Sequence, residues 1–185
     1  WTFALFDSLS LSLATVLQGL RLLGLQPVRA VAASFAAPSS SAAAISHSFV
    51  ASGRAGDERF PAGTLGLQLP IFESLGLKID GFYHGTINVS LAPLVPQPQQ
   101  PLVTFRDVQW HPGCAAEDFS FFDIQVAGPD RVPVSAFIYW PHPETKPEHF
   151  QDPHVVEVLA PHLEDVSEGL PVWLWVAPSR MIFKR

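Results

Sequence analysis

The sequence predicts a mainly β protein, a small barrel or sandwich with one or two short helices. Two observations indicate this class. From about residue 46 onward, short apolar runs alternate with glycine and proline, as is typical of strands joined by tight turns. The chain also contains 18 prolines in 185 residues, roughly twice the usual frequency. Because proline destabilises helix interiors and central strands, this content favours many turns and short strands.

The expected strands follow one another along the second part of the chain. They cover residues 46–51, 64–69, 85–91, 102–110, 119–126, 132–139, 155–159 and 172–177. A short helix is expected near residues 70–75 and should end at Gly76, because glycine is common just past a helix C-terminus. Residues 94–101 are expected to form an extended polar loop. Short strands with tight links are typical of barrels and sandwiches.

Residues 1–45 are expected to form a leader, and residues 46–185 the β domain. The leader is rich in Leu, Ala and Ser, and its apolar run is interrupted by Asp7 and Arg21. It therefore lacks the roughly 20 continuous apolar residues that span a membrane. Its later part is composed like a transit peptide or a flexible linker. A disordered segment, a transit peptide and spurious upstream sequence all stay open, and removal of residues 1–44 should be tolerated.

The charge balance argues against two kinds of partner. The chain has 11 Lys and Arg residues against 17 Asp and Glu, a net charge of −6. Binding to a nucleic-acid backbone or to anionic lipid needs clustered positive charge, so neither nucleic acid nor a membrane is expected as a partner. The single cysteine, Cys114, fits a reducing compartment. We expect a cytoplasmic location, or an organelle if the leader is a transit peptide.

The segment GFYHGTINVSL, residues 81–91, indicates a strand with one polar face. Residues two apart in a strand share a face, so Thr86 and Asn88 project together. A hydroxyl and an amide oxygen suit Mg²⁺, which takes its remaining charge from substrate phosphates. Gly85, which lacks a Cβ, would let a phosphate chain approach the backbone. From spacing alone, an ordinary exposed strand face is the commoner explanation.

Several segments in the same order resemble the CTP-dependent riboflavin kinases of the archaeal type. GTINVSL looks like a central strand of that family, and ASGRAGDERFP resembles its glycine-rich opening loop. FFDIQV and VPVSAFIYWPHPETKPEHF resemble two central strands with the following loop, and VVEVLAP is similar to a strand carrying one glutamate. The resemblance covers about residues 47–183. It implies a closed cradle-loop β-barrel, CTP as phosphoryl donor, riboflavin as acceptor, FMN as product and Mg²⁺ as cofactor.

The resemblance also implies roles for individual residues. Those that match functional positions of the family are the metal ligands Thr86 and Asn88, the nucleotide-loop glycines Gly53 and Gly56, the substrate-binding Thr145, and Glu157 at the flavin end.

Glu157 is also notable on physical grounds, because it lies in an otherwise apolar strand. A buried carboxylate must find a partner or become neutral. Glu157 could hydrogen-bond the ribityl chain of riboflavin, or act as the catalytic base that accepts the proton of the attacking hydroxyl. The alternative is a carboxylate at a barrel rim, paired with water or with Lys146.

Two segments depart from the family. HLEDVSEGLPVW, which follows Pro161, is shorter than the family segment and lacks its leucine-arginine pair, and the loop before Phe60 carries the charged residues DER. Since a fold does not determine a function, a non-catalytic barrel that binds flavin or nucleotide, or an interaction module, is the alternative to the kinase.

Overall fold

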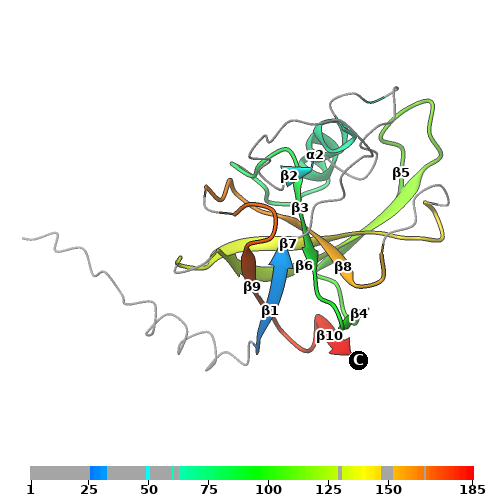
Figure 1. The fold of residues 1–185 in the computed structure, drawn as a ribbon. Helices are drawn as coiled ribbons and strands as arrows, with labels where there is room; N and C mark the ends of the chain where they lie inside the picture. The colour runs from blue at the N-terminus through cyan, green and yellow to red at the C-terminus, as the bar shows by residue number, and fades with distance from the viewer. Residues whose placement is uncertain are drawn as a thin grey trace, which may run out of the picture.

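The structure is a computed structural model that describes residues 26–32, 49–50, 60, 63–128, 131–146, 152–164 and 166–185, the first two ranges by their backbone alone. Within these residues it contains ten strands and one helix (Figure 1). In chain order they are β1 (Gln26–Ala32), β2 (Phe49–Val50), α2 (Leu65–Ser74), β3 (Thr86–Ser90), β4 (Val95–Pro98), β5 (Val103–Val108), β6 (Glu117–Ala127), β7 (Val134–Pro141), β8 (Val155–Leu159), β9 (Pro171–Val176) and β10 (Met181–Lys184). The mainly β class is therefore confirmed. Among the described residues, no helix is both long and apolar enough to cross a membrane.

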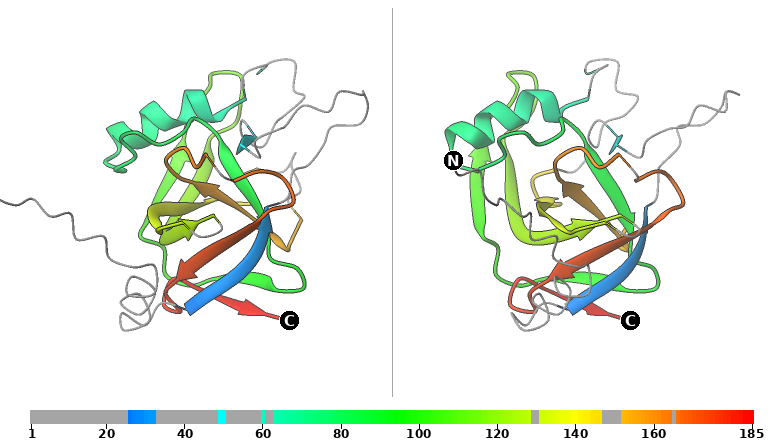
Figure 2. Two further views of the ribbon diagram at one scale, coloured as in Figure 1. Left: turned by 60° about the vertical axis from the view of Figure 1, so that its left-hand side comes forward. Right: turned by 90° about the vertical axis from the view of Figure 1, so that its left-hand side faces the viewer.

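Eight of these strands form one sheet. Its order is β1-β9-β6-β7-β8-β3-β2, with β5 paired to β6 and an additional pairing between β1 and β3. The remaining two strands, β4 and β10, form a separate antiparallel pair. Figure 2 shows β1 running alongside β9, with the β10 end of the chain close by. Closure of the sheet into a barrel stays a prediction.

The two faces of the sheet pack against two different clusters of buried side chains. On β6, Phe122 and Ile124 belong to one cluster, and Phe119 and Phe121 belong to the other. This division follows from the strand backbone, which points successive side chains to opposite faces. The second cluster includes the buried face of α2, with Phe72 edge-on to Phe121 at 5.0 Å between ring centroids. Helix α2 therefore covers the face of the sheet that carries Phe119 and Phe121 (Figure 2).

The strand expected at residues 64–69 is wrong, because residue 64 caps helix α2 and residues 65–69 form its first half. The alternating pattern TLGLQL looked like a strand, but Leu65, Leu69 and Phe72 are buried together at the spacing of one helix face. The expected end of the helix is confirmed. Gly76 has a φ of 98°, and its N–H donates to the carbonyl of Glu73 at 2.9 Å, a conformation that suits glycine just past a helix.

Besides β1, two strands, β4 and β10, lie where none was expected. Strand β4 falls within residues 94–101, the expected polar loop, and pairs with β10. Pro96 and Pro98 have no backbone N–H, so they cannot donate the hydrogen bonds that a strand between two neighbours needs. A two-stranded sheet accepts them because each of its strands is an edge. The sequence did not indicate this pair because its strands are far apart along the chain.

The expected leader also needs correction where the structure describes it. Strand β1 pairs with β9 through six residue pairs, from Gln26↔Val176 to Val31↔Pro171, and its last two residues pair with β3. Residues 26–32 are therefore part of the sheet, although they fall within the stretch 1–45. The rest of the expected leader lies outside the described residues.

A pair of truncations should separate β1 from the residues before it. Removing residues 1–32 should lower the free energy of unfolding by more than ~2 kcal/mol relative to removing residues 1–25, because β9 and β3 then lose their hydrogen-bonded neighbour. Urea denaturation of both truncated proteins measures the difference. Equal stability would show that β1 contributes nothing to the fold.

Candidate functional site

The candidate site begins with a row of side chains that crosses three strands. In the antiparallel register, Asn88 of β3 is opposite Glu157 of β8, and Glu157 is opposite Tyr139 of β7. Directly opposed residues share a face of the sheet. Thr86, two residues before Asn88, shares that face as well. Three residues that the sequence analysis selected from two separate segments are thus brought together.

These side chains are withdrawn from solvent. Thr86 is 0% exposed, Glu157 5% and Asn88 7%. The Thr86 hydroxyl donates to Oδ1 of Asn88 at 3.4 Å, which is long for such a bond. The same single hydrogen can instead be donated to the Glu157 carboxyl group. No atom of the described residues hydrogen-bonds Oε2 of Glu157.

Burial raises the pKa of Glu157 above its ordinary value of 4.5, because the charged form loses its hydration. The positive charge of Lys146 and the hydrogen bond with Thr86 act in the opposite direction. Desolvation is the larger effect, so Glu157 keeps its proton to a higher pH than an exposed glutamate. A carboxyl group with a raised pKa is a stronger base, once ionised, than an exposed one, and this favours proton exchange with a substrate hydroxyl.

Glu157 lies in the wall of a cavity of about 260 Å³. The walls come from β4, β7, β8 and the residues between β7 and β8, namely Val95, Pro96, Tyr139, Trp140, Pro141, Pro143, Lys146, Asp152, Pro153, Val155, Val156 and Glu157. Two aromatic side chains and four prolines make most of this surface apolar and stiff. Such a cavity suits a flat, partly apolar molecule that is oriented by a few polar groups.

The other predicted site residues are placed differently. Gly85 is buried directly before β3, and its contact with a phosphate chain stays a prediction. Thr145 does not line the cavity. Its hydroxyl instead accepts the N–H of Asp118 at 2.9 Å and donates to the carbonyl of His142 at 3.2 Å. Gly53 and Gly56 lie outside the described residues, so the nucleotide loop stays a prediction.

Sequence reasoning missed part of the surroundings of Glu157. Trp140 lines the cavity, and the hydroxyl of Tyr139 donates to Oε1 of buried Gln68 at 3.0 Å. Gln68 could not be recognised as a partner, because it was assigned to a strand rather than to the helix above the sheet. Lys146 could have been selected from the sequence, because it is a lone lysine in the proline-rich loop after β7. The sequence pattern indicated it only as an ion-pair partner of Glu157.

The oxygen atoms on β3 are of the kind that binds a hard cation. A hydroxyl and an amide oxygen would be contributed by Thr86 and Asn88. These two oxygens, 3.4 Å apart, are close to the separation of about 3 Å between neighbouring ligands of Mg²⁺. Within the described part of the chain, no group of three or more His, Cys, Asp or Glu side chains could hold a metal ion. Two neutral oxygen ligands suit Mg²⁺ that takes its other ligands from water and phosphates.

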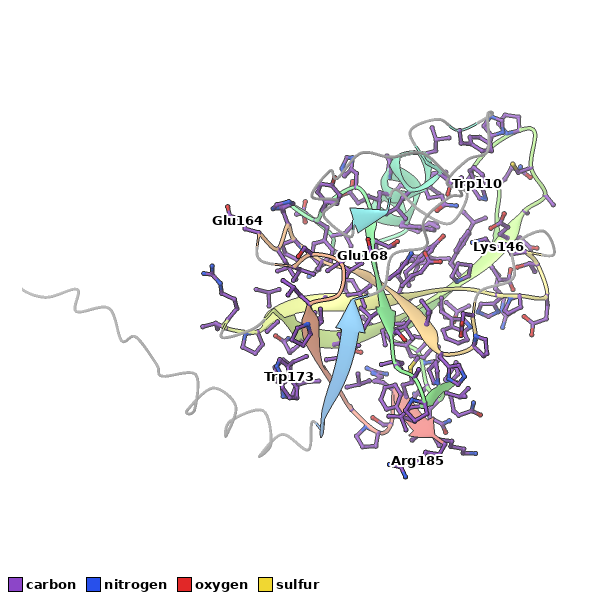
Figure 3. The ribbon with its side chains drawn as sticks, in the orientation of Figure 1. Trp110, Lys146, Glu164, Glu168, Trp173 and Arg185 are labelled. Carbon is purple, nitrogen blue, oxygen red and sulfur yellow. The ribbon has the colours of Figure 1, made fainter. Side chains whose placement is uncertain are left out.

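A second hollow, of about 420 Å³, contains none of the predicted residues. It is lined by Arg131, His162 and Glu164, among others. Figure 3 shows Glu164 and Lys146 at opposite sides of the molecule. The second hollow is therefore separate from the cavity at Glu157.

Replacing the buried carboxyl group should change how stability depends on pH. Above pH 4.5, and up to its raised pKa, Glu157 binds more protons in the folded than in the unfolded protein, so the free energy of unfolding falls as pH rises. Glu157→Gln has no titrating group at this position. Its stability relative to the parent should therefore increase with pH, in urea denaturation from about pH 4 to about pH 8.

The control is Glu168→Gln, at an exposed position. This variant should track the parent protein across the same range. A Glu157→Gln protein whose stability differs from that of the parent by the same amount at every pH would contradict the raised pKa.

Comparisons with protein-family models, with curated proteins and with solved structures find no match to this chain. The function proposed below therefore rests on the site residues and on the sequence motifs.

Proposed function

We propose that this protein is a riboflavin kinase that transfers a phosphoryl group from CTP to riboflavin with the help of Mg²⁺. The observation that carries the proposal is the meeting of Thr86, Asn88 and Glu157 on one face of neighbouring strands. Of the three, Glu157 lines the cavity. The resemblance of the sequence motifs to the kinase family implies that Thr86 and Asn88 are metal ligands and that Glu157 is the carboxyl group on the acceptor side. The proposal includes the closed barrel of the family. Pairing of β1 with β3 supports it, because it joins the two ends of the order β1-β9-β6-β7-β8-β3.

The proposed reaction assigns a role to each residue. Thr86 and Asn88 would hold Mg²⁺, which would supply positive charge to the phosphates of CTP. The terminal ribityl hydroxyl oxygen forms a bond to the γ-phosphorus, the bond between that phosphorus and its bridging oxygen breaks, and CDP leaves. Glu157 accepts the hydroxyl proton. Phosphoryl transfer depends mainly on positioning and charge stabilisation, so a weak base is sufficient.

A second candidate function is a flavin-binding or nucleotide-binding module without catalysis, or an interaction module. The complete burial of Thr86 favours it, because a metal ligand must be accessible when the nucleotide binds. The segment after Pro161, which departs from the family, points the same way. The kinase is the better supported function because all three oxygen-bearing side chains are retained side by side.

FMN formation tests the reaction and its donor directly. The purified protein is incubated with riboflavin, Mg²⁺ and equal concentrations of CTP, UTP, GTP or ATP, and FMN is separated by chromatography. We expect FMN with CTP and much less with the other three, because a base that leaves buried polar groups unpaired costs about 1 to 3 kcal/mol per group. Faster turnover with ATP would refute the choice of donor. No FMN with any donor would favour the non-catalytic module.

Two substitutions on β3 test the metal ligands. Thr86→Val and Asn88→Ala should weaken Mg²⁺-dependent binding of CTP by about tenfold or more, because each removes one oxygen ligand. Ser90→Ala, on the same face of the same strand, is the matched control and should bind CTP like the parent. Calorimetric titration measures the affinity, and circular dichroism checks the fold. Parent-like affinity in both ligand variants would remove the proposed metal site.

A further inference from the structure

The hydroxyl of Thr145 is already used within the protein. It accepts the N–H of Asp118 and donates to the carbonyl of His142. Its two hydrogen bonds tie the residues after β7 to the start of β6, and Thr145 is not among the residues that line the cavity. A hydroxyl held in this way positions its own segment and is poorly placed to contact a substrate.

The next residue, Lys146, is in the cavity wall. Among the described residues that line the cavity, it is the one with a positive charge, facing the carboxyl groups of Asp152 and Glu157. The Lys146 charge acts on Glu157 strongly enough to oppose the effect of burial on the carboxyl group. Lys146 therefore shares the cavity wall with Glu157, the residue opposite Asn88 in the sheet.

The backbone before Lys146 is fixed by several bonds. The N–H of His142 donates to the carbonyl of Asp118 at 2.9 Å, and Nε2 of His142 lies 2.8 Å from the hydroxyl of buried Ser120. The N–H of Thr145 bonds the carbonyl of His142, and the N–H of Lys146 bonds that of Pro143 at 3.3 Å. This turn fixes the backbone of Lys146 before a ligand arrives, which lowers the backbone entropy lost on binding.

We propose that Lys146, rather than Thr145, binds the phosphate chain of the nucleotide, and that it does so when the chain carries Mg²⁺. The assignment rests on the proposed function and names the group that recognises the donor's phosphates. Thr145 is a positioning residue that fixes the turn carrying Lys146. A lysine ammonium is a common ligand of phosphate because it brings a full positive charge with three donors.

The cavity wall offers little positive charge of its own to a phosphate chain. Lys146 shares the wall with the carboxylate of Asp152, so a bare polyphosphate, which carries several negative charges, would be incompletely neutralised there and Mg²⁺ would supply the remaining positive charge. Oδ1 of Asp152 accepts the N–H of His154 at 2.8 Å and so closes a turn. Glu157, opposite Asn88 in the sheet, stays the acceptor-side carboxyl group of the proposed reaction. A magnesium-bound phosphate chain would then be held through the metal on one side and by Lys146 on the other.

The test measures binding of inorganic tripolyphosphate by calorimetry, with and without Mg²⁺ and without riboflavin. The parent protein should bind it only with Mg²⁺. Lys146→Gln should weaken this binding by about tenfold or more, since it removes a charge-assisted contact. Lys146→Arg keeps the charge and should stay within about threefold of the parent. Lys78→Gln, at an exposed lysine outside the cavity, is the matched control and should bind like the parent.

Thr145 provides a second comparison. Thr145→Ser keeps the hydroxyl and should bind tripolyphosphate like the parent, whereas Thr145→Val should lose affinity together with thermal stability, because the turn loosens. Thr145→Val with weaker binding and unchanged stability would make Thr145 the phosphate contact and overturn the assignment. Parent-like affinity in Lys146→Gln, or no binding by the parent protein with Mg²⁺, would overturn it too.

These results are separate from the test of the proposed function. FMN formation together with Lys146-independent binding would refute the role of Lys146 and leave the kinase intact. Lys146-dependent binding of tripolyphosphate without FMN formation would refute the kinase and leave the phosphate site.

Discussion

The antiparallel register between β3, β8 and β7 is the constraint on which the candidate site depends. It sets Asn88, Glu157 and Tyr139 side by side on the face that helix α2 covers. A slip by one residue would turn all of these side chains to the opposite face, which packs against the other core cluster. The apolar residues between them, such as Ile87 and Val158, prevent that slip because they are themselves fully buried. The same alternation that forms the core thus orients the polar residues.

Burial changes the pKa of Glu157 and also lowers the stability of the fold, because a buried carboxyl group loses its hydration. The Glu157 carboxyl group is enclosed, and burial, the Lys146 charge and the Thr86 hydroxyl together set its pKa. An exposed glutamate would be a weaker base at neutral pH, and an isolated buried one would stay protonated. Glu157 is buried, but the Lys146 charge and the Thr86 hydroxyl both oppose the effect of desolvation on its pKa.

Much of the sheet could be predicted from the sequence, because strands such as β8 and β6 show short apolar runs bounded by turns. The same pattern failed at residues 64–69, where the alternation of Leu65, Leu67 and Leu69 also fits a helix and only packing against Phe121 decides. The oxygen-bearing residues on β3 and β8 were found because period-two spacing fixes their face. Lys146 and the hydrogen bonds of Thr145 were not, since loop geometry depends on partners such as Asp118 that are distant in sequence.

The pairing of β4 with β10 gives the cavity a wall that does not belong to the main sheet. Val95 and Pro96 of β4 line the cavity, and β10 holds β4 in place through pairs such as Phe183↔Pro96. Arg180, just before β10, anchors this element through an ion pair of 2.7 Å with Asp123 of β6. Sequence change in β10 can therefore adjust the width of the cavity while the strand that carries Glu157 stays the same. The selectivity of the cavity and the chemistry of the carboxyl group can thus evolve independently.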